Sequence, residues 1–290
     1  MNRATFCKQL DVINFVTWLV NNLPTLPIQL CIPYHRRFVP LKSGINVKVQ
    51  GIQNVIPNHY VWRATGMKVG DWKETVPFVL ALASNLRATV AASNTAGTLL
   101  ACEDVLRWGG DRNALKGAKP FLVSLGPNLP TYIANVGATL DLAKANLTTF
   151  TPPVLRMNSM LSKIHALYST DGLPIYDSRV AAAIATLVEM WRLASGIHTR
   201  PIPDLLKFPA TLRSRMVTNA FSCAPTPGVL NYAAVVATAR QWCCAMVRLG
   251  WLMGSVLNKM PDLWPCTTAP QRMRNFEAAL FMIGYDVKCL

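Results

Sequence analysis

The chain has 290 residues, of which 51% are apolar, 15% charged and 9% aromatic. An apolar share this high excludes intrinsic disorder over most of the chain, and no internal repeat indicates a solenoid or an array. Lys and Arg number 29 against 14 Asp and Glu, a net charge of +15, so the surface favours an anionic partner. Nucleic acid is the commonest such partner, and an anionic membrane is the other.

The sequence lacks the patterns typical of secreted and membrane proteins. The first apolar stretch is interrupted by Lys8 and Asp11 and has no small-residue cleavage site, which argues against a signal peptide. The most hydrophobic later stretch, residues 232–257, contains Arg240 and Arg248, so we expect buried helices there. The eight cysteines form no CxxC pair, and none has a histidine at zinc-ligand spacing. This predicts reduced thiols in a cytoplasmic protein without a metal site or a cofactor.

In chain order, the hydrophobic pattern first predicts a helix over residues 1–23. Prolines then recur up to residue 66, and INVKVQGI (45–52) alternates apolar and polar residues as a short strand does. From Val76 onward helix patterns dominate, separated by loops that contain Pro and Gly. The predicted helices cover residues 76–92, 97–108, 131–146, 154–168, 178–195, 210–220, 229–256 and 270–283.

These elements predict a mainly α fold with a small β-containing N-terminal extension. The extension, with short strands, is placed at residues 1–75, and the helical domain at residues 76–290. No stretch has the composition of a flexible linker, so we expect one compact unit of two lobes.

The segment over residues 160–191 carries the residues suited to chemistry. Asp177 precedes a strongly amphipathic helix, where an N-cap carboxylate sits at the positive end of the helix dipole. Lys163 lies near the start of the preceding helix, and the short loop between them could bring the amine and the carboxylate to one cleft. Each residue also has a plainer explanation: a cap for Asp177, a solvated side chain for Lys163, and packing or a hydrogen bond for His165.

Lys163 with its following isoleucine, and the tract PIYDSRVAAA (174–183), resemble the catalytic segment of a known family. The family is the helix-hairpin-helix (HhH-GPD) DNA glycosylase superfamily, and the closer likeness is to its bacterial branch similar to 8-oxoguanine DNA glycosylase. LRWGGD (106–111) is also similar to that branch. The chain departs from the family at residues 156–162, because the family hairpin normally contains glycines there. The resemblance implies a two-lobed helical HhH-GPD-like fold with its catalytic segment at residues 154–195.

The same resemblance implies a DNA glycosylase, which flips a modified base out of double-stranded DNA and cleaves its N-glycosidic bond to leave an abasic site. Asp177 would stabilise the cationic sugar, and the nucleophile would be the Lys163 amine, through a Schiff base with possible lyase activity, or a water. Two substrates remain open. One is hypermodified cytosine, such as glucosylated hydroxymethylcytosine, in defence against phage, and the other is 8-oxoguanine in DNA repair. The basic N-terminal lobe, residues 24–73, would reshape the pocket for an unusual base.

Two sets of residues are candidates to contact DNA in a protein expected to act as a monomer. The aromatic candidates for the base pocket are Trp108, Tyr168, Trp191, Trp242 and Trp251. The candidates for contacts with the DNA backbone are Arg156, Asn158, Ser159, Ser162, Arg179, Arg200, Lys207, Arg213, Arg215 and Arg240.

The sequence lacks the characteristic motifs of several other enzyme classes. It has no GxSxG elbow, HExxH pair, GxxxxGK[ST] loop or GxGxxG helix start. The main alternative is a non-catalytic protein that binds DNA through its basic surface. A membrane-surface protein is a further alternative, but no helix has a clean basic amphipathic face.

Overall fold

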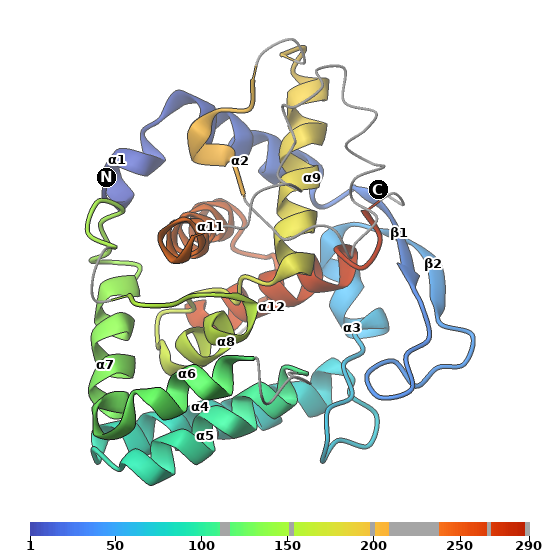
Figure 1. Cartoon of the computed structure of the whole chain (residues 1–290). Helices are drawn as coiled ribbons and strands as arrows, with labels where there is room; N and C mark the ends of the chain where they lie inside the picture. The colour runs from blue at the N-terminus through green and yellow to red at the C-terminus, as the bar shows by residue number, and fades with distance from the viewer. Residues whose placement is uncertain (111–116, 151–153, 198–200, 209–237, 266–267, 288–290) are drawn as a thin grey trace.

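The computed structural model describes residues 1–110, 117–150, 154–197, 201–208, 238–265 and 268–287 (Figure 1). Within these residues the chain is mainly helical, which confirms the prediction of a mainly α chain, and its only sheet has two strands. The predicted helix over 210–220 lies outside the described residues. No described helix is both long enough and apolar enough to cross a membrane.

Five helices from the middle of the chain pack on one another: α4 (Trp72–Ala91), α5 (Thr95–Trp108), α6 (Ala118–Ser124), α7 (Leu129–Leu140) and α8 (Ser159–Tyr168). Three of them begin at a side-chain cap, since Asp71, Asn94 and Asn158 each accept a hydrogen bond from a backbone N–H of the first turn. Helix α8 contacts α4, α5 and α7, so its apolar face is buried and only its first turns reach the site.

A second group of helices brings the N-terminal segment together with helices from the second half of the chain. It consists of α1 (Arg3–Cys7), α2 (Leu10–Asn22), α9 (Ser178–Ala194), α11 (Ala239–Lys259) and α12 (Ala269–Ile283). Helix α2 packs against α9 and α11, and α12 packs against α9. The first 22 residues therefore lie with C-terminal helices, whereas the sequence pattern grouped them with the extension.

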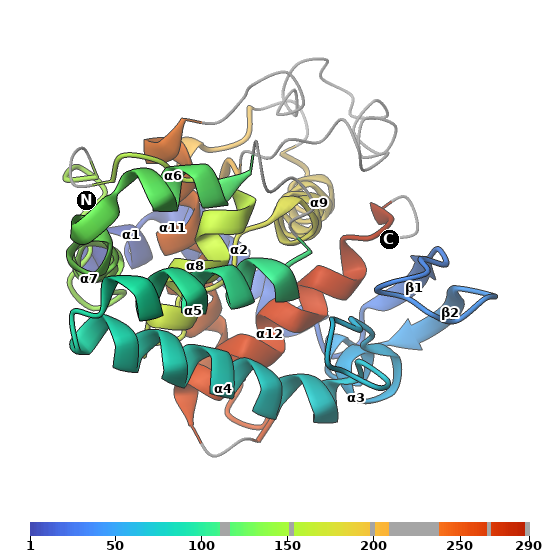
Figure 2. The same ribbon diagram turned by 60° about the horizontal axis from the view of Figure 1, so that its bottom comes forward.

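The rest of the N-terminal extension forms a small separate layer. Strands β1 (Pro27–Ile32) and β2 (Ile45–Gln50) pair in antiparallel register, with Ile28 opposite Val49 and Leu30 opposite Val47. The alternating apolar residues of β1 face the core, and β1 contacts α12. A short helix, α3 (Val55–His59), follows and also packs on α12. The strands extend at one edge of the molecule (Figure 2).

The structure differs from the predicted elements at several boundaries. The predicted first helix is two helices, because the chain breaks at Lys8 and Gln9. Helices α3 and α6 occupy stretches predicted as extended or loop. Helix α7 ends at Leu140, since the Asp141 carboxylate accepts hydrogen bonds from the next backbone N–H groups and closes a turn.

Candidate active site

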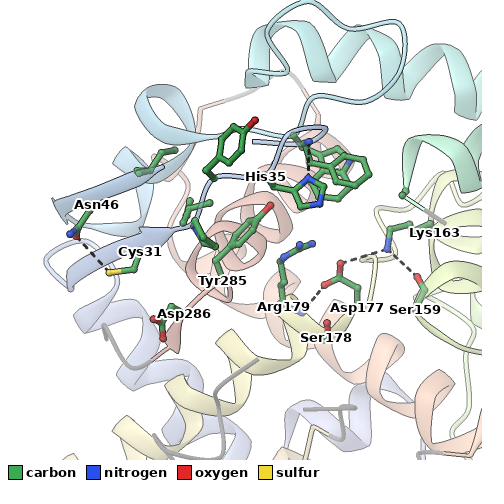
Figure 3. Close-up of a pocket in the computed structure, with 18 of the residues that line it drawn as sticks. Cys31, His35, Asn46, Ser159, Lys163, Asp177, Ser178, Arg179, Tyr285 and Asp286 are labelled. Atoms are coloured by element: carbon green, nitrogen blue, oxygen red, sulfur yellow. Dashed lines mark hydrogen bonds and ion pairs between the residues drawn. The ribbon is translucent and has the colours of Figure 1, made fainter. Parts of the chain in front are cut away.

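An open cavity of about 760 Å³ lies where the first turns of α8 and α9 face the N-terminal extension (Figure 3). Its size is within the range of small-molecule sites. The helical wall consists of Ser159, Met160, Lys163, Asp177, Ser178 and Arg179. The extension wall consists of Cys31, Ile32, Pro33, Tyr34, His35, Phe38, Ser43, Ile45, Asn46 and Trp62. Gly109, Gly110, Tyr285 and Asp286 complete the lining.

The start of α8 and the start of α9 are fastened to each other. Asn158 caps α8 by accepting from the N–H groups of its first turn, and Asp177 caps α9 in the same way. The Ser162 hydroxyl, fully buried, lies 3.2 Å from the Tyr176 carbonyl and donates to it. Because both helices start at this junction, the side chains of their first turns point to the same cavity.

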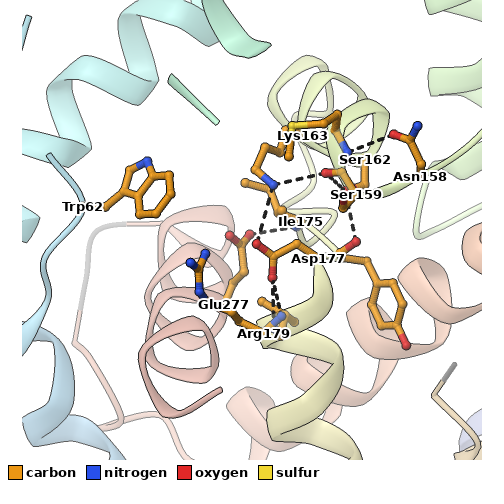
Figure 4. A network of polar contacts seen from close by, with 12 residues as sticks. Trp62, Asn158, Ser159, Ser162, Lys163, Ile175, Asp177, Arg179 and Glu277 are labelled. Atoms are coloured by element: carbon orange, nitrogen blue, oxygen red, sulfur yellow. Dashed lines mark hydrogen bonds and ion pairs between the residues drawn. The ribbon is translucent and has the colours of Figure 1, made fainter. Parts of the chain in front are cut away.

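Lys163 and Asp177 form a buried pair on the helical wall (Figure 4). The Lys163 Nζ lies 3.6 Å from Asp177 Oδ2, and the two side chains are 6% and 7% exposed. The amine also donates to the Ser159 carbonyl at 3.1 Å. Asp177 Oδ1 accepts from the backbone N–H groups of Arg179 and Val180 at 2.9 and 3.1 Å. One carboxylate oxygen thus caps the helix while the other faces the amine.

Burial is the largest influence on the pKa of the Lys163 amine. Burial lowers the pKa of Lys163 below its usual value, the nearby Arg179 lowers it further, and the charges of Asp177 and Glu277 act in the opposite direction. A neutral lysine is a nucleophile, whereas an ammonium group is not. The site therefore combines a carboxylate with an amine that loses its proton more readily than an exposed lysine does.

Glu277, from α12, belongs to the same polar cluster and was not a sequence candidate. Its Oε2 accepts from the Ile175 N–H at 2.9 Å and pairs with Arg274. Burial raises the pKa of Glu277, although Arg274 opposes this shift. Glu277 lies beside Asp177 in Figure 4, yet it is distant in sequence and no local motif marks it.

Rings from several elements line a small inner pocket next to the pair of Lys163 and Asp177. Trp108, one of the five aromatic candidates, lines this inner pocket. The pocket lining also includes Tyr60, Trp62, Trp72 and Phe281, none of which was a sequence candidate.

His35, Phe38 and Trp62 form a stack of rings on the extension wall. The centroids of Phe38 and Trp62 are 4.0 Å apart with an interplanar angle of 2°, and those of His35 and Phe38 are 5.0 Å apart. The Trp62 indole also donates to the Trp108 carbonyl at 2.9 Å, which joins this wall to the end of α5.

The other four aromatic candidates lie away from the cavity, so their assignment to the base pocket is corrected. Trp242 and Trp251 are buried and donate their indole N–H groups to the carbonyls of Tyr176 and Leu142. Trp191 packs on Phe15, at a centroid distance of 5.5 Å. Tyr168 packs against Gly137, where an added Cβ would lie 2.6 Å from the Tyr168 ring. Helical periodicity directs these rings to the core, which is the commonest place for tryptophan.

Among the backbone-contact candidates that the structure describes, only Ser159 and Arg179 line the cavity. Asn158 accepts the hydrogen bonds that cap α8, and Ser162 donates the hydrogen bond to the Tyr176 carbonyl that joins the two helix starts. The others lie elsewhere: Arg156 is exposed near the Phe121 ring, Lys207 pairs with Asp204, and Arg240 donates to the Leu147 carbonyl. Arg200, Arg213 and Arg215 lie outside the described residues.

The extension carries basic residues that were not individual candidates. Exposed Arg36 and half-buried Arg37 stand between His35 and Phe38 of the extension wall, and Arg63 donates to the Arg36 carbonyl at 2.9 Å. Between residues 24 and 73 the only acid is Asp71. A positive rim beside the cavity suits the phosphates of a nucleic acid.

The structure explains why glycine stands at the two glycine positions of LRWGGD (106–111), Gly109 and Gly110: a side chain at either position would collide with its surroundings. An added Cβ at Gly109 would lie 2.5 Å from Lys163 Cδ. Gly110 has a φ of +83°, and its added Cβ would lie 2.8 Å from Phe38 Cζ. The two glycines allow the lysine and the ring stack to approach the end of α5.

No three His, Cys, Asp or Glu side chains in the described part of the chain are close enough to hold a metal ion. Comparison with known proteins finds no family model, no curated protein and no solved structure that matches the chain.

Proposed function

We propose that the chain is a DNA glycosylase that removes a modified base from double-stranded DNA. The observation that carries the proposal is the buried pair of Lys163 and Asp177, 3.6 Å apart, on the wall of a cavity of about 760 Å³. A buried amine and carboxylate that face an open cavity are the groups needed to displace a base from C1′ of a deoxyribose.

In the proposed reaction, a base flipped into the cavity places C1′ at Lys163 and Asp177. The lysine amine attacks C1′ as the C1′–N bond breaks, and the bond electrons leave with the base, which takes up a proton. The Asp177 carboxylate stabilises the positive charge that develops on the sugar and then accepts a proton from the alkylated amine. The nitrogen lone pair then forms the Schiff base on Lys163 as the C1′–O4′ bond breaks and O4′ takes up the proton held by Asp177. Water hydrolyses the Schiff base to release the Lys163 amine and leave an abasic site.

The proposed substrate is a hypermodified cytosine, such as glucosylated hydroxymethylcytosine, in viral DNA. The cavity supports this choice, because its volume is in the range that holds drug-sized molecules and a plain nucleobase is smaller. Its extension wall also presents polar groups, among them Tyr34, Ser43 and Asn46, that suit a sugar substituent. The alternative substrate is 8-oxoguanine in base-excision repair.

The test compares the wild type with Asp177→Asn and with Asp71→Asn as a matched control. Both substitutions keep a good N-cap, since asparagine caps helices as well as aspartate does, and Asp71 caps α4 by accepting from the Glu74 N–H at 2.8 Å. Each protein is incubated with DNA that contains unmodified bases, 8-oxoguanine, uracil or glucosylated hydroxymethylcytosine. Abasic sites are scored by alkaline cleavage, and borohydride traps any lysine adduct.

We expect abasic sites with the wild type and with Asp71→Asn, and a loss of about 100- to 1000-fold with Asp177→Asn. The modified lane that reacts names the substrate. Abasic sites from 8-oxoguanine alone would replace the cytosine assignment. Tight DNA binding with no abasic site in any lane would leave the non-catalytic DNA-binding protein as the better description.

A further inference from the structure

Arg179 occupies an unusual position on the cavity wall. It lies in the first turn of α9, two residues after Asp177. Its guanidinium carbon is 4.1 Å from the ring centroid of Tyr285, 4.7 Å from that of Phe281 and 5.2 Å from that of Trp62. These cation–π contacts hold the guanidinium group in place from three sides.

One hydrogen-bond donor of this guanidinium group has no partner within the described part of the chain. Its Nε is buried without a hydrogen-bond partner, and its side chain forms no hydrogen bond or ion pair with a described residue. Contacts with aromatic rings use the faces of a guanidinium group and leave the N–H groups at its edge to donate. A buried donor without a partner costs free energy, so its retention at a cavity wall points to a ligand that supplies the acceptor.

The location favours a base over a phosphate as that ligand. Arg179 lines both the open cavity and the inner aromatic pocket, together with Lys163 and Asp177 (Figure 3). A base that enters the cavity would lie among these rings, whereas the DNA backbone would remain at the rim. A planar guanidinium edge matches two adjacent acceptors in one plane, as in the pairing of arginine with guanine.

We propose that Arg179 determines base specificity by donating two hydrogen bonds to a carbonyl oxygen and an adjacent unprotonated ring nitrogen of the flipped base. This inference rests on the proposed function in that the cavity receives a base. Cytosine carries such a pair at O2 and N3, and guanine carries one at O6 and N7. Thymine and adenine carry none.

The proposed contact distinguishes hypermodified cytosine from 8-oxoguanine. A substituent at C5 of cytosine leaves O2 and N3 unchanged, so a hypermodified cytosine keeps the pair. In 8-oxoguanine N7 bears a proton, so the O6 and N7 edge offers one acceptor and one donor. Two donors from Arg179 therefore fit a modified cytosine and not the oxidised edge of 8-oxoguanine.

The experiment measures binding and does not depend on bond cleavage. In an Asp177→Asn background, the dissociation constant is measured by fluorescence anisotropy for four duplexes at one salt concentration. Each duplex carries one cytosine, guanine, thymine or adenine opposite a tetrahydrofuran spacer, so that the base is unpaired in all four. The proteins are the background itself and the same background with Arg179→Met, Arg179→Lys or Arg87→Met. Arg87 is the matched control, because it is half-buried, donates to the Leu167 carbonyl at 3.0 Å and lies outside the cavity.

The background protein should bind the cytosine and guanine duplexes roughly ten- to hundredfold more tightly than the other two, the preference that one bidentate contact supplies. Arg179→Met should bind all four alike, and Arg87→Met should keep the preference. Arg179→Lys should also lose the preference, because lysine keeps the charge but lacks the fork of donors. The lysine variant keeps a cation among the three rings, and the thermal midpoint of each variant shows that it is folded.

Two results would overturn the inference. A uniform loss of affinity for all four duplexes in Arg179→Met, with a weaker dependence on salt, would identify a phosphate contact. If Arg179→Lys kept the full preference for the cytosine and guanine duplexes, the positive charge alone would explain the preference, without a fork of two donors. Failure of the proposed function is distinct: the wild type would then form no abasic site on any DNA, while a preference that depends on Arg179 would persist.

Discussion

The two walls of the cavity are built from different kinds of structure. The helical wall brings ionisable side chains from the first turns of α8 and α9, and caps and buried hydrogen bonds hold it. The extension wall brings rings and polar groups from β1, β2 and the loop between them, together with Trp62 after α3. Rigid helix starts suit groups that must keep one geometry during a reaction, whereas loop-borne groups suit the recognition of a ligand.

Because of this difference, we expect substitutions on the two walls to have different effects on the reaction. Changes at Lys163, and at the residues that position it, should lower the rate for every substrate, and changes on the extension wall should alter how well a substrate binds. The following predictions test that division, beginning with the largest expected effect on activity.

Lys163→Met should lower base release by about 1000-fold or more and abolish the adduct trapped by borohydride, because the nucleophile is lost. Methionine has a similar length and keeps the buried stem packed. Lys119→Met is the control, since Lys119 pairs with Glu103 at 2.9 Å, outside the cavity, and should leave the rate unchanged. Base release that continues in Lys163→Met without an adduct would assign the nucleophile to water.

Gly109→Ala should lower kcat by about a hundredfold, because displacement of a reacting group by about an ångström has an effect of that size. The added Cβ would lie 2.5 Å from Lys163 Cδ, so the lysine must move. In the control Gly254→Ala, on α11, the Cβ would meet only Arg3, at 3.4 Å. Equal kinetics in the two variants would show that the end of α5 does not position the lysine.

Phe38→Leu should raise KM about tenfold and change kcat little, since one aromatic stacking contact is worth ~1–3 kcal/mol. The substitution removes the middle ring of the stack between His35 and Trp62 and keeps the site apolar. Phe121→Leu, on α6 and outside the cavity, should leave KM unchanged. An equal loss in kcat would mean that the extension wall also positions the reacting groups.

Glu277→Gln should shift the pH dependence of base release to lower pH. The rate should rise with pH as Lys163 loses its proton, and the Glu277 charge raises the pKa of that amine, so its removal lowers the pKa. Glutamine can still accept the hydrogen bond from Ile175. The measurement is single-turnover rate against pH, with Glu103→Gln as the control. A shift to higher pH would contradict the assigned direction.

His165→Leu should leave activity nearly unchanged and remove part of the acid sensitivity of the fold. Burial lowers the pKa of His165 to about 3, and neither ring nitrogen bonds to a described residue. The folded state then keeps His165 neutral while the unfolded chain binds a proton below about pH 6.5, so stability falls as pH decreases. Between pH 7.5 and 4.5 the wild type should lose about 2–3 kcal/mol through this group, and the variant should not. Urea unfolding at both pH values measures the difference, and an equal loss in both proteins would contradict it.

The local parts of the site were predictable because short-range sequence rules govern them. Asp177 is a helix cap, as its position before an amphipathic helix indicates, and Lys163 lies on the preceding helix. Only a short loop separates the two helices, so few residues are within reach of each side chain. The plainer interpretations of Asp177 as a cap and of His165 as a packed residue are both correct descriptions of the structure.

Residues that are distant in sequence could not be predicted in this way. Glu277, Phe38, Trp62 and Tyr285 reach the cavity because α12 and the extension fold against α9, and no local pattern encodes that contact. Residue type alone also gave wrong candidates for the lining of the cavity. Trp191, Trp242 and Trp251 are aromatic, as are the rings of the cavity, but they are buried in the core.

By itself, the sequence determined the mainly helical class, the cap at the start of α9 and the short loop that separates the helices of Lys163 and Asp177. These features depend on helical periodicity, capping and short loops, all of which act over a few residues. The tertiary structure decided which rings line the cavity, how deeply Lys163 is buried and what surrounds Arg179. Those properties depend on which side chains from distant segments are buried against one another, and this is decided only when the whole chain packs.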